Sequence, residues 1–221
     1  MIDNVNDIMR RVEAAAKLGS NVKIVAATKT VPPERINAIR ALGIGAMGEN
    51  RVQELLSKYD ALEMDEIHFI GALQTNKVKY IIDKVSLIQS VDRFELAKEI
   101  DKRAKAINKV MPVLIEVNIG GEESKSGCSE ENLFEFIIKL KELGNLRIDG
   151  LMSVLPIDAD RALYERMYDL YKKADKLFGG MKYLSMGMSE DFELAIECGA
   201  NMVRIGSGIF GKRQQIREGE K

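Results

Sequence analysis

The first apolar run of the sequence ends at a lysine. The stretch "IVAATKT", residues 24–30, is apolar until Lys29. If it forms a strand, its side chains alternate, so Lys23, Val25, Ala27 and Lys29 share one face, and the small Ala27 leaves space beneath Lys29. Partial burial disfavours an ammonium and leaves more free amine to attack a carbonyl. Lys29 can therefore form a Schiff base, or, alternatively, reach solvent or pair with an acidic loop residue.

A glycine-rich turn is the second feature with chemical potential. The stretch "RIGSGIFG", residues 204–211, places three glycines where an apolar run gives way to a helix. Backbone N–H groups in such a turn can approach an anion closely. Ser189, in "SMGMS", can donate a hydroxyl hydrogen bond to the same anion, or it can cap the helix that follows. The two segments together predict a phosphate site.

Arg204 begins the glycine-rich stretch and has two interpretations. It can be a structural cation paired with Glu116, because an unpaired buried charge is costly. Beside a Schiff-base lysine and a phosphate site, it can instead face the ring nitrogen of pyridoxal phosphate. An arginine there cannot accept the pyridinium proton, so the cofactor would be a weaker electron sink. This second interpretation disfavours chemistry that needs a strongly stabilised carbanion.

Short apolar stretches and helical segments alternate along the whole chain, which predicts a parallel sheet. Eight such stretches fit an α/β fold, a (β/α)8 TIM barrel with an extra amphipathic helix at the N-terminus; periodicity alone also allows a doubly wound sheet. The stretches are "VKIVAAT" (22–28), "IGAMG" (44–48), "IHFIG" (67–71), "SLIQSV" (86–91), "PVLIEVNI" (112–119), "LRIDGLMSV" (146–154), "KYLSMG" (182–187) and "NMVRIG" (201–206).

A barrel predicts where the site lies, because chemistry in this fold occurs at the carboxyl ends of the strands. Polar residues gather at these positions, and they are Thr28, Lys29, Glu49, Asn50, Glu116, Asn118, Ser153, Ser189 and Arg204. The only histidine, His68, is expected at the start of the third strand, at the opposite end of the barrel, in a structural role. Lys125, in the loop after the fifth strand, is a possible second amine or a solvated loop lysine.

Composition excludes several classes of protein. The chain has 221 residues, a net charge of −1 and no Trp, so neither a nucleic-acid surface nor a membrane span is expected. Its length suits one domain, residues 1–221. The two cysteines, Cys128 and Cys198, support neither a disulfide framework nor a metal site. We therefore expect a cytoplasmic protein with reduced thiols and no metal.

Several motifs in order resemble the pyridoxal phosphate homeostasis proteins, small relatives of the barrel domain of alanine racemases. They are "AATKT" (26–30), "GENRVQE" (48–54), "HFIGALQTNK" (68–77), "SKSG" (124–127), "GLMSV" (150–154), "SMGMSEDFELAIECG" (185–199) and "VRIGSGIFG" (203–211). The resemblance implies a cofactor on Lys29, Arg204 near its ring nitrogen, and Asn50 beside it. It also implies a phosphate group held by Ser189, Gly206 and Ser207. The family usually has histidine where this chain has Ala72, which places any contact made there in doubt.

The resemblance implies a protein that holds pyridoxal phosphate for vitamin B6 homeostasis and can deliver it to apo-enzymes, without catalytic residues. It permits a monomer. A racemase needs a second acid or base, which alanine racemases take from another domain. Tyr164, Tyr168 and Tyr171 have helical spacing, which favours packing. Two alternatives stay open: a pyridoxal phosphate racemase or decarboxylase of low activity, and a barrel in which Lys29 forms a Schiff base with a sugar phosphate.

Overall fold

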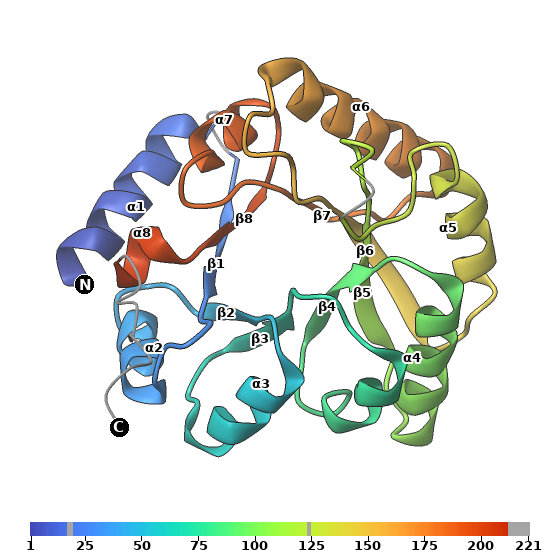
Figure 1. Cartoon of the computed structure of the whole chain (residues 1–221), viewed down its shortest axis with the longest axis horizontal. Helices are drawn as coiled ribbons and strands as arrows, with labels where there is room; N and C mark the ends of the chain where they lie inside the picture. The colour runs from blue at the N-terminus through green and yellow to red at the C-terminus, as the bar shows by residue number, and fades with distance from the viewer. Residues whose placement is uncertain (17–19, 123–124, 212–221) are drawn as a thin grey trace, which may run out of the picture.

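Eight parallel strands form a closed barrel in the computed structural model, which describes residues 1–16, 20–122 and 125–211 (Figure 1). Neighbours in the sheet follow chain order, and β8 pairs with β1, which excludes the doubly wound alternative. The strands are β1 (Lys23–Ala27), β2 (Ala46–Glu49), β3 (Glu66–Phe69), β4 (Leu87–Val91), β5 (Met111–Glu116), β6 (Leu146–Met152), β7 (Tyr183–Ser185) and β8 (Met202–Ile205). All eight predicted strands are therefore confirmed, each within a few residues.

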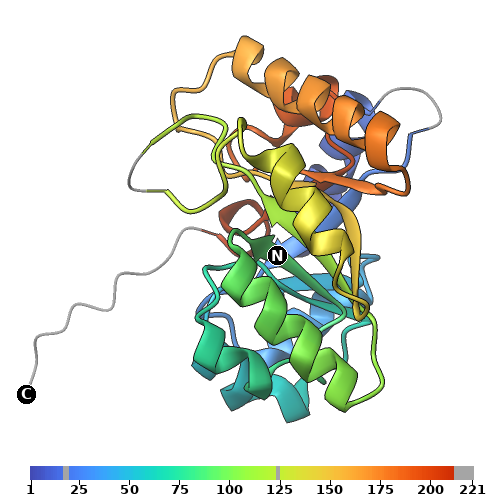
Figure 2. The same cartoon turned by 90° about the vertical axis from the view of Figure 1, so that its right-hand side faces the viewer.

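Helices cover the outside of the barrel (Figures 1 and 2). They are α1 (Ile2–Ala15), α2 (Pro33–Arg40), α3 (Val52–Lys58), α4 (Phe94–Ala106), α5 (Leu133–Lys141), α6 (Arg161–Phe178), α7 (Phe192–Glu197) and α8 (Ser207–Phe210), with short 3-10 helices η1 (Tyr59–Ala61) and η2 (Thr75–Tyr80). Helix α1 precedes β1 and packs on α7 and α8, which confirms the extra N-terminal helix.

Local sequence explains where several helices begin and end. Helix α2 starts with Pro33, whose ring fixes a helical φ and whose missing N–H would have no partner in the first turn. Asp160 caps α6 by accepting from the Leu163 N–H at 3.1 Å. Gly179 ends that helix with a φ of 68°, a conformation that glycine adopts without strain.

Alternation along the strands separates two apolar layers. One cluster fills the barrel interior, and its buried members are Val25, Ala46, Leu87, Leu114, Met152 and Met202. Strand neighbours of these residues, such as Ala26 and Val203, instead pack between the sheet and the helices. Because side chains alternate, the inner face that carries Val25 continues to Ala27 and then Lys29, as the sequence predicts.

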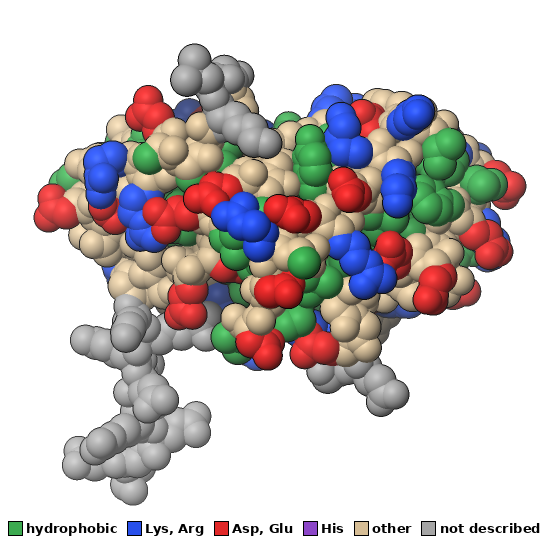
Figure 3. Space-filling view, turned by 90° about the horizontal axis from the view of Figure 1, so that it is seen from above, with side chains coloured by type: hydrophobic (Ala, Val, Ile, Leu, Met, Phe, Trp, Pro, Cys, Tyr) green, Lys and Arg blue, Asp and Glu red, His purple; other side chains and the backbone are tan. Residues whose placement is uncertain are grey.

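The surface carries charges of both signs. Lys, Arg, Asp and Glu side chains are interspersed over the face seen from above, with no large area of a single sign (Figure 3). Within the described ranges, no helix is both long enough and apolar enough to span a lipid bilayer. Those ranges also lack any cluster of three or more His, Cys, Asp or Glu side chains that could hold a metal ion.

Candidate functional site

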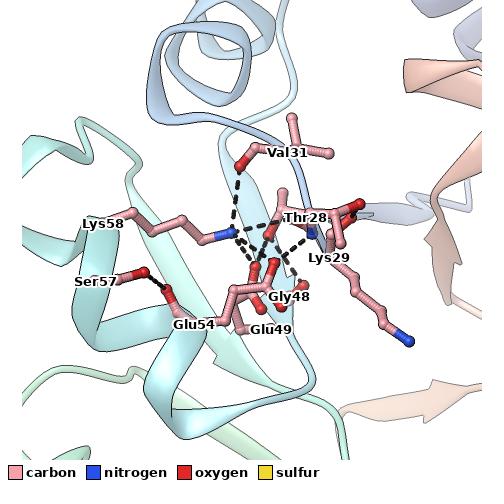
Figure 4. A network of polar contacts seen from close by, with 9 residues as sticks. Thr28, Lys29, Val31, Gly48, Glu49, Glu54, Ser57 and Lys58 are labelled. Atoms are coloured by element: carbon pink, nitrogen blue, oxygen red, sulfur yellow. Dashed lines mark hydrogen bonds and ion pairs between the residues drawn. The ribbon is translucent and has the colours of Figure 1, made fainter. Parts of the chain in front are cut away.

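Lys29 follows β1 at the carboxyl end of the barrel. Its side chain is half-buried, and in the described part of the chain its Nζ atom makes no hydrogen bond or ion pair. Figure 4 shows this side chain pointing away from the polar network that surrounds the neighbouring backbone. Within the described ranges the amine is therefore unpaired at the barrel mouth, which leaves it available to form a Schiff base.

A buried network on the helix side of the sheet holds the segment that carries Lys29 (Figure 4). Lys58, at the end of α3, donates through Nζ to the Thr28 carbonyl at 3.0 Å and the Val31 carbonyl at 3.4 Å, and forms an ion pair with Glu49. Thr28 Oγ1 donates to Glu49 Oε1 at 2.7 Å. The Lys58 and Glu49 side chains are only 6% and 0% exposed. The main chain before and after Lys29 is thus held by hydrogen bonds to the buried Lys58 side chain.

Thr30, next to Lys29, has a φ of 64°, which is uncommon outside glycine. Its N–H donates to the Glu54 carboxylate, and its hydroxyl donates to the Lys29 carbonyl at 2.6 Å. These contacts offset the cost of the left-handed backbone. Glu49, expected among the mouth residues, instead points toward the helices and belongs to this supporting network.

The loops after β7 and β8 meet at Ser189. Its Oγ atom accepts hydrogen bonds from the Gly206 N–H at 3.2 Å and the Gly208 N–H at 3.1 Å. Helix α7 has Asp191 as its N-cap residue, so the capping alternative for Ser189 is wrong. The structure therefore gathers Ser189, Gly206 and the exposed Ser207, three of the predicted phosphate residues, around one turn.

Closure of the barrel brings these loops next to Lys29. The β1–β8 register places Val25 opposite Arg204 and Ala26 opposite Ile205. Both strands run in the same direction, so the chain beyond Ala27 lies beside the turn that starts at Gly206. A Cβ atom built on Gly206 would lie 3.4 Å from the Ala27 carbonyl oxygen, which shows how closely the two segments approach.

Arg204 lies inside the barrel, just below this turn, and is 5% exposed. It donates through NH1 to Ser185 Oγ at 2.7 Å and through NH2 to the Ser153 carbonyl at 2.8 Å. Burial lowers the pKa of Arg204 to about 10, although the charge of Glu116 opposes this shift. No ion pair joins the two side chains among the described residues, so the expected Arg204–Glu116 pair is not formed. The guanidinium is anchored by neutral oxygens.

Glu116 projects into the barrel near the mouth and is 7% exposed. Burial raises its pKa from 4.5 to about 7; Asp92 adds to the increase, and the charge of Arg204 opposes it. A carboxyl group of this kind holds a proton more tightly in the folded chain than in the unfolded chain. Folding is therefore favoured at low pH, and this contribution is lost as pH rises through about 7.

We expect the Glu116→Gln variant to reveal this dependence, because the amide cannot ionise. Relative to the wild type, its free energy of unfolding should increase by up to about 3 kcal/mol between about pH 4 and about pH 8. Urea unfolding across this pH range measures the difference. A flat difference for Glu116→Gln would contradict the assignment.

Asn50 follows β2 at the mouth and is exposed, and in the described part of the chain its side chain makes no hydrogen bond. Its backbone packs directly against Gly71, in the motif "HFIGALQTNK": a Cβ atom on Gly71 would overlap the Asn50 main chain. The Ile70 N–H also donates to the Glu49 carbonyl at 2.9 Å. Gly71 thus permits the close approach that places Asn50, while Ala72 is exposed beside it.

Replacement of Gly71 by alanine should therefore displace Asn50. The overlap involves main-chain atoms that cannot rotate away, so we expect a loss of about 1–3 kcal/mol in the free energy of unfolding. Gly144→Ala is the matched control, because a Cβ atom there would meet nothing within 4 Å. That control should stay within about 0.5 kcal/mol of the wild type. Equal stability of the two variants in urea would show that the β2–β3 contact relaxes easily.

Other predicted residues lie away from the mouth or support it. Asn118 and Lys125 lie in the loop after β5 and are held within it. Asn118 donates to the Glu122 carbonyl at 2.8 Å, and Lys125 forms an ion pair with the Glu122 side chain. The three tyrosines lie on α6, where Tyr164 donates to Asp191 at 2.6 Å and Tyr171 donates to the Met181 carbonyl at 3.1 Å. Tyr164 belongs to the main hydrophobic core and the other two tyrosines pack against it, which confirms their predicted packing role.

The sequence predicts that His68 lies at the end of the barrel opposite the site, and this position is wrong. It is the third residue of β3, fully buried in the barrel interior, and it contacts Glu66 at 3.0 Å and Gln89 at 2.9 Å. The error arises because β3 begins at Glu66. His68 therefore lies two residues farther along the strand, on the same inward face as Glu66. Lys58, Gln89 and Ser185 also support the site and were not predicted from the sequence, where only their place in or beside apolar segments indicates that they are buried.

Comparisons with known proteins agree with this arrangement. The family model for "Alanine racemase, N-terminal domain" matches residues 1–214. Proteins named "Pyridoxal phosphate homeostasis protein" are similar: one from Aquifex aeolicus is 46% identical, covering 96% of this chain and 98% of the relative, and one from Pseudomonas aeruginosa is 35% identical, covering 96% and 95%.

Among solved structures, the chain is similar to PipY of Synechococcus elongatus, whose structure was determined with pyridoxal phosphate bound. The TM-score is 0.82 and the identity 27%, and the similarity covers 96% of this chain and 100% of PipY. Fold, motif order and full-length similarity thus lead to the same group. The chain belongs to the family of the alanine racemase N-terminal domain and, within it, to the pyridoxal phosphate homeostasis proteins.

Proposed function

We propose that this protein binds pyridoxal phosphate and maintains intracellular vitamin B6 homeostasis. The observation that carries the proposal is the placement of Lys29 beside the Ser189–Gly206 turn, with no hydrogen-bond or ion-pair partner for its amine among the described residues. Relatives named for pyridoxal phosphate homeostasis and the cofactor-bound structure of PipY support it. When bound, the cofactor supplies a reactive aldehyde, a ring nitrogen and a phosphate group.

The residues at the barrel mouth fit these three parts. Lys29 Nζ would form a C=N bond to the aldehyde carbon, and the aldehyde oxygen would leave as water. Ser189, Gly206 and Ser207 would hold the phosphate. The Ser189 oxygen accepts from the Gly206 and Gly208 N–H groups, which leaves its own proton to be donated, and the exposed Ser207 hydroxyl lies on the same turn. Arg204 would face the ring nitrogen with N–H groups that Ser185 and Ser153 do not use. Asn50 would lie beside the cofactor.

We further propose that the bound cofactor is stored and handed to apo-enzymes in the cytoplasm rather than used in catalysis, and that the protein acts as a monomer. An arginine facing the ring nitrogen leaves it without a proton and makes the cofactor a weak acceptor of electrons. Names of relatives refer to homeostasis rather than to a reaction, in agreement with this proposal. Incorporation of solvent deuterium at the α-carbon of an amino acid would favour the racemase alternative.

Reduction of the purified protein with borohydride tests cofactor binding directly. Supplied with pyridoxal phosphate, the protein should develop a visible absorption band that borohydride removes. Peptide mass mapping should then find the reduced cofactor attached to Lys29. A protein without such a band would overturn the proposal and favour a sugar phosphate as the partner of Lys29. Attachment at another lysine would move the site.

A further inference from the structure

A chain of hydrogen bonds crosses the barrel interior and ends at Arg204. Starting at the amino end of the barrel, where the partly exposed Glu66 begins β3, Glu66 Oε2 contacts His68 Nε2 at 3.0 Å, and His68 Nδ1 contacts Gln89 Nε2 at 2.9 Å. Ser185 Oγ donates to Gln89 Oε1 at 2.7 Å and accepts from Arg204 NH1, also at 2.7 Å. The residues come from β3, β4, β7 and β8, so the chain exists only because the barrel closes (Figure 1).

The hydrogen bonds in this chain have one consistent direction. Ser185 donates to the Gln89 carbonyl oxygen, so the amide nitrogen of Gln89 faces His68 and donates to Nδ1. An accepting Nδ1 carries no proton, which places the ring proton on Nε2, where it is donated to Glu66. The second amide proton of Gln89 points to the sulfur of Met202 at 3.3 Å. Each contact then joins one donor to one acceptor.

Electrostatics favour the same proton placement. Burial lowers the pKa of His68, although the hydrogen bond and charge of Glu66 oppose this effect, and Lys23 adds to the decrease. The hydrogen bond from His68 is the main cause that lowers the pKa of Glu66 to about 2, so this carboxylate stays ionised. Lys23 also donates to Glu66 at 2.5 Å. The neutral ring with its proton on Nε2 is the form that suits these neighbours.

The direction of the chain determines how Arg204 is held. Because the Ser185 proton is committed to Gln89, the Ser185 oxygen presents lone pairs to Arg204 NH1. The Ser153 carbonyl holds NH2, so the plane of the guanidinium is defined at two points. If His68 carried its proton on Nδ1, two donors would face each other, and the Gln89 amide would have to turn over. The Ser185 proton would then lose its acceptor.

We propose that His68 and Gln89 are positioning residues of the cofactor site, which fix from within the barrel how Ser185 presents Arg204 to the ring nitrogen of the cofactor. The role of Arg204 toward that nitrogen rests on the proposed function. The direction of the hydrogen bonds does not, because it is a property of the protein without cofactor. The inference therefore has one test that needs no ligand and one that does.

The test without ligand uses the single histidine of the chain as its own probe. Two-bond ¹H–¹⁵N NMR correlations of the cofactor-free protein distinguish the two neutral tautomers and the charged ring. We expect the neutral ring with the proton on Nε2 at neutral pH. A proton on Nδ1, or a charged ring at neutral pH, would overturn the inference whatever the protein binds, and the measurement requires no variant to fold.

The test with ligand compares two substitutions of similar size. In His68→Asn the side-chain oxygen can replace Nδ1 as the acceptor from Gln89, whereas His68→Leu has no acceptor. We expect His68→Leu to bind pyridoxal phosphate about tenfold more weakly and to shift the visible band, because the hydrogen bonding of a charged group is disturbed. His68→Asn should stay close to the wild type in both measurements. A role in packing alone would not separate the two variants in this direction.

Two further variants complete the comparison. Ser185→Ala should resemble His68→Leu, because it removes the last link before Arg204. Ser90→Ala is the matched control: Ser90 is buried on β4 beside Gln89, and its hydroxyl has no partner among the described residues. If the wild type binds pyridoxal phosphate and His68→Leu binds it equally well with an unchanged band, only the inference fails. If the wild type takes up no pyridoxal phosphate, the proposed function fails, and the positioning role fails with it.

Discussion

The Lys29→Ala variant should lose the visible absorption band of bound pyridoxal phosphate completely and should take up no label on borohydride treatment. Alanine has no amine, and the half-buried backbone around residue 29 offers no other nucleophile to the aldehyde. Weak noncovalent binding should remain, because the phosphate turn at Ser189 and Gly206 lies on other loops. Absorption spectra and fluorescence titration of the variant and the wild type measure the two effects separately.

Lys125 provides the control for this experiment. It is a lysine in the loop after β5, on the same side of the barrel, and its amine is paired with Glu122. Lys125→Ala should keep the band and the label of the wild type. A Lys29→Ala protein that still forms the band, or a Lys125→Ala protein that loses it, would show that the Schiff base forms elsewhere. Lys29→Ala should fold normally, because the Lys29 Nζ makes no hydrogen bond or ion pair with the described residues.

The architecture could be predicted because its signal is repeated along the chain. Each strand is a short apolar run, and each is followed by a segment of helical period, so errors of one or two residues at strand ends do not change the result. The sequence alone allows an open sheet as well as a barrel, because closure depends on the pairing of β8 with β1, between residues far apart in sequence. Periodicity contains no information about that pairing.

Residues at strand ends were also predictable, since parallel strands bring their carboxyl ends to one face. Lys29, Arg204 and Ser189 are predicted to lie together for this reason, and the structure brings them to one end of the barrel. Glu49 was misplaced because the last residue of a short strand can point to either face. If the strand alternation is shifted by one residue, a side chain expected in the barrel interior points to the helix layer instead.

The supporting residues could not be found from the sequence. In the sequence, Lys58 is an ordinary basic residue in the last turn of a helix, a place where lysine usually meets solvent. Its burial depends on Thr28 and Val31, about 30 positions earlier, whose carbonyls approach it only in the folded chain. Gln89 and Ser185 likewise become partners across the barrel interior. Such contacts are properties of the closed fold.

Replacement of Lys58 by methionine should have the largest effect on stability. Methionine fills the space of the lysine stem but leaves the Glu49 carboxylate buried without its cation. Loss of one partner of a buried ion pair costs about 3–5 kcal/mol in the free energy of unfolding. It also releases the Thr28 and Val31 carbonyls on either side of Lys29. Urea unfolding should therefore show a large loss, and the variant should bind pyridoxal phosphate more weakly as well.

An exposed ion pair of the same type provides the comparison. Lys139 pairs with Glu135 on the surface of α5 at 2.7 Å, and the side chains are 52% and 68% exposed. Lys139→Met should change stability by less than about 1 kcal/mol, since solvent screens both charges. If the two lysine variants lost the same small amount, the Lys58–Glu49 contact would be no stronger than a surface pair.

The double variant Glu49→Gln/Lys58→Met separates the two roles of the network. Glu49 Oε2 has no hydrogen-bond partner among the described residues, so the carboxylate is incompletely satisfied even in the wild type. Removal of both charges should therefore recover a large part of the stability that Lys58→Met loses. Binding of pyridoxal phosphate should not recover with it, because the Lys58 Nζ that holds both carbonyls beside Lys29 is absent from the double variant. Recovery of both would mean that the buried charges, and not the lysine's contacts with the main chain, place Lys29 at the barrel mouth.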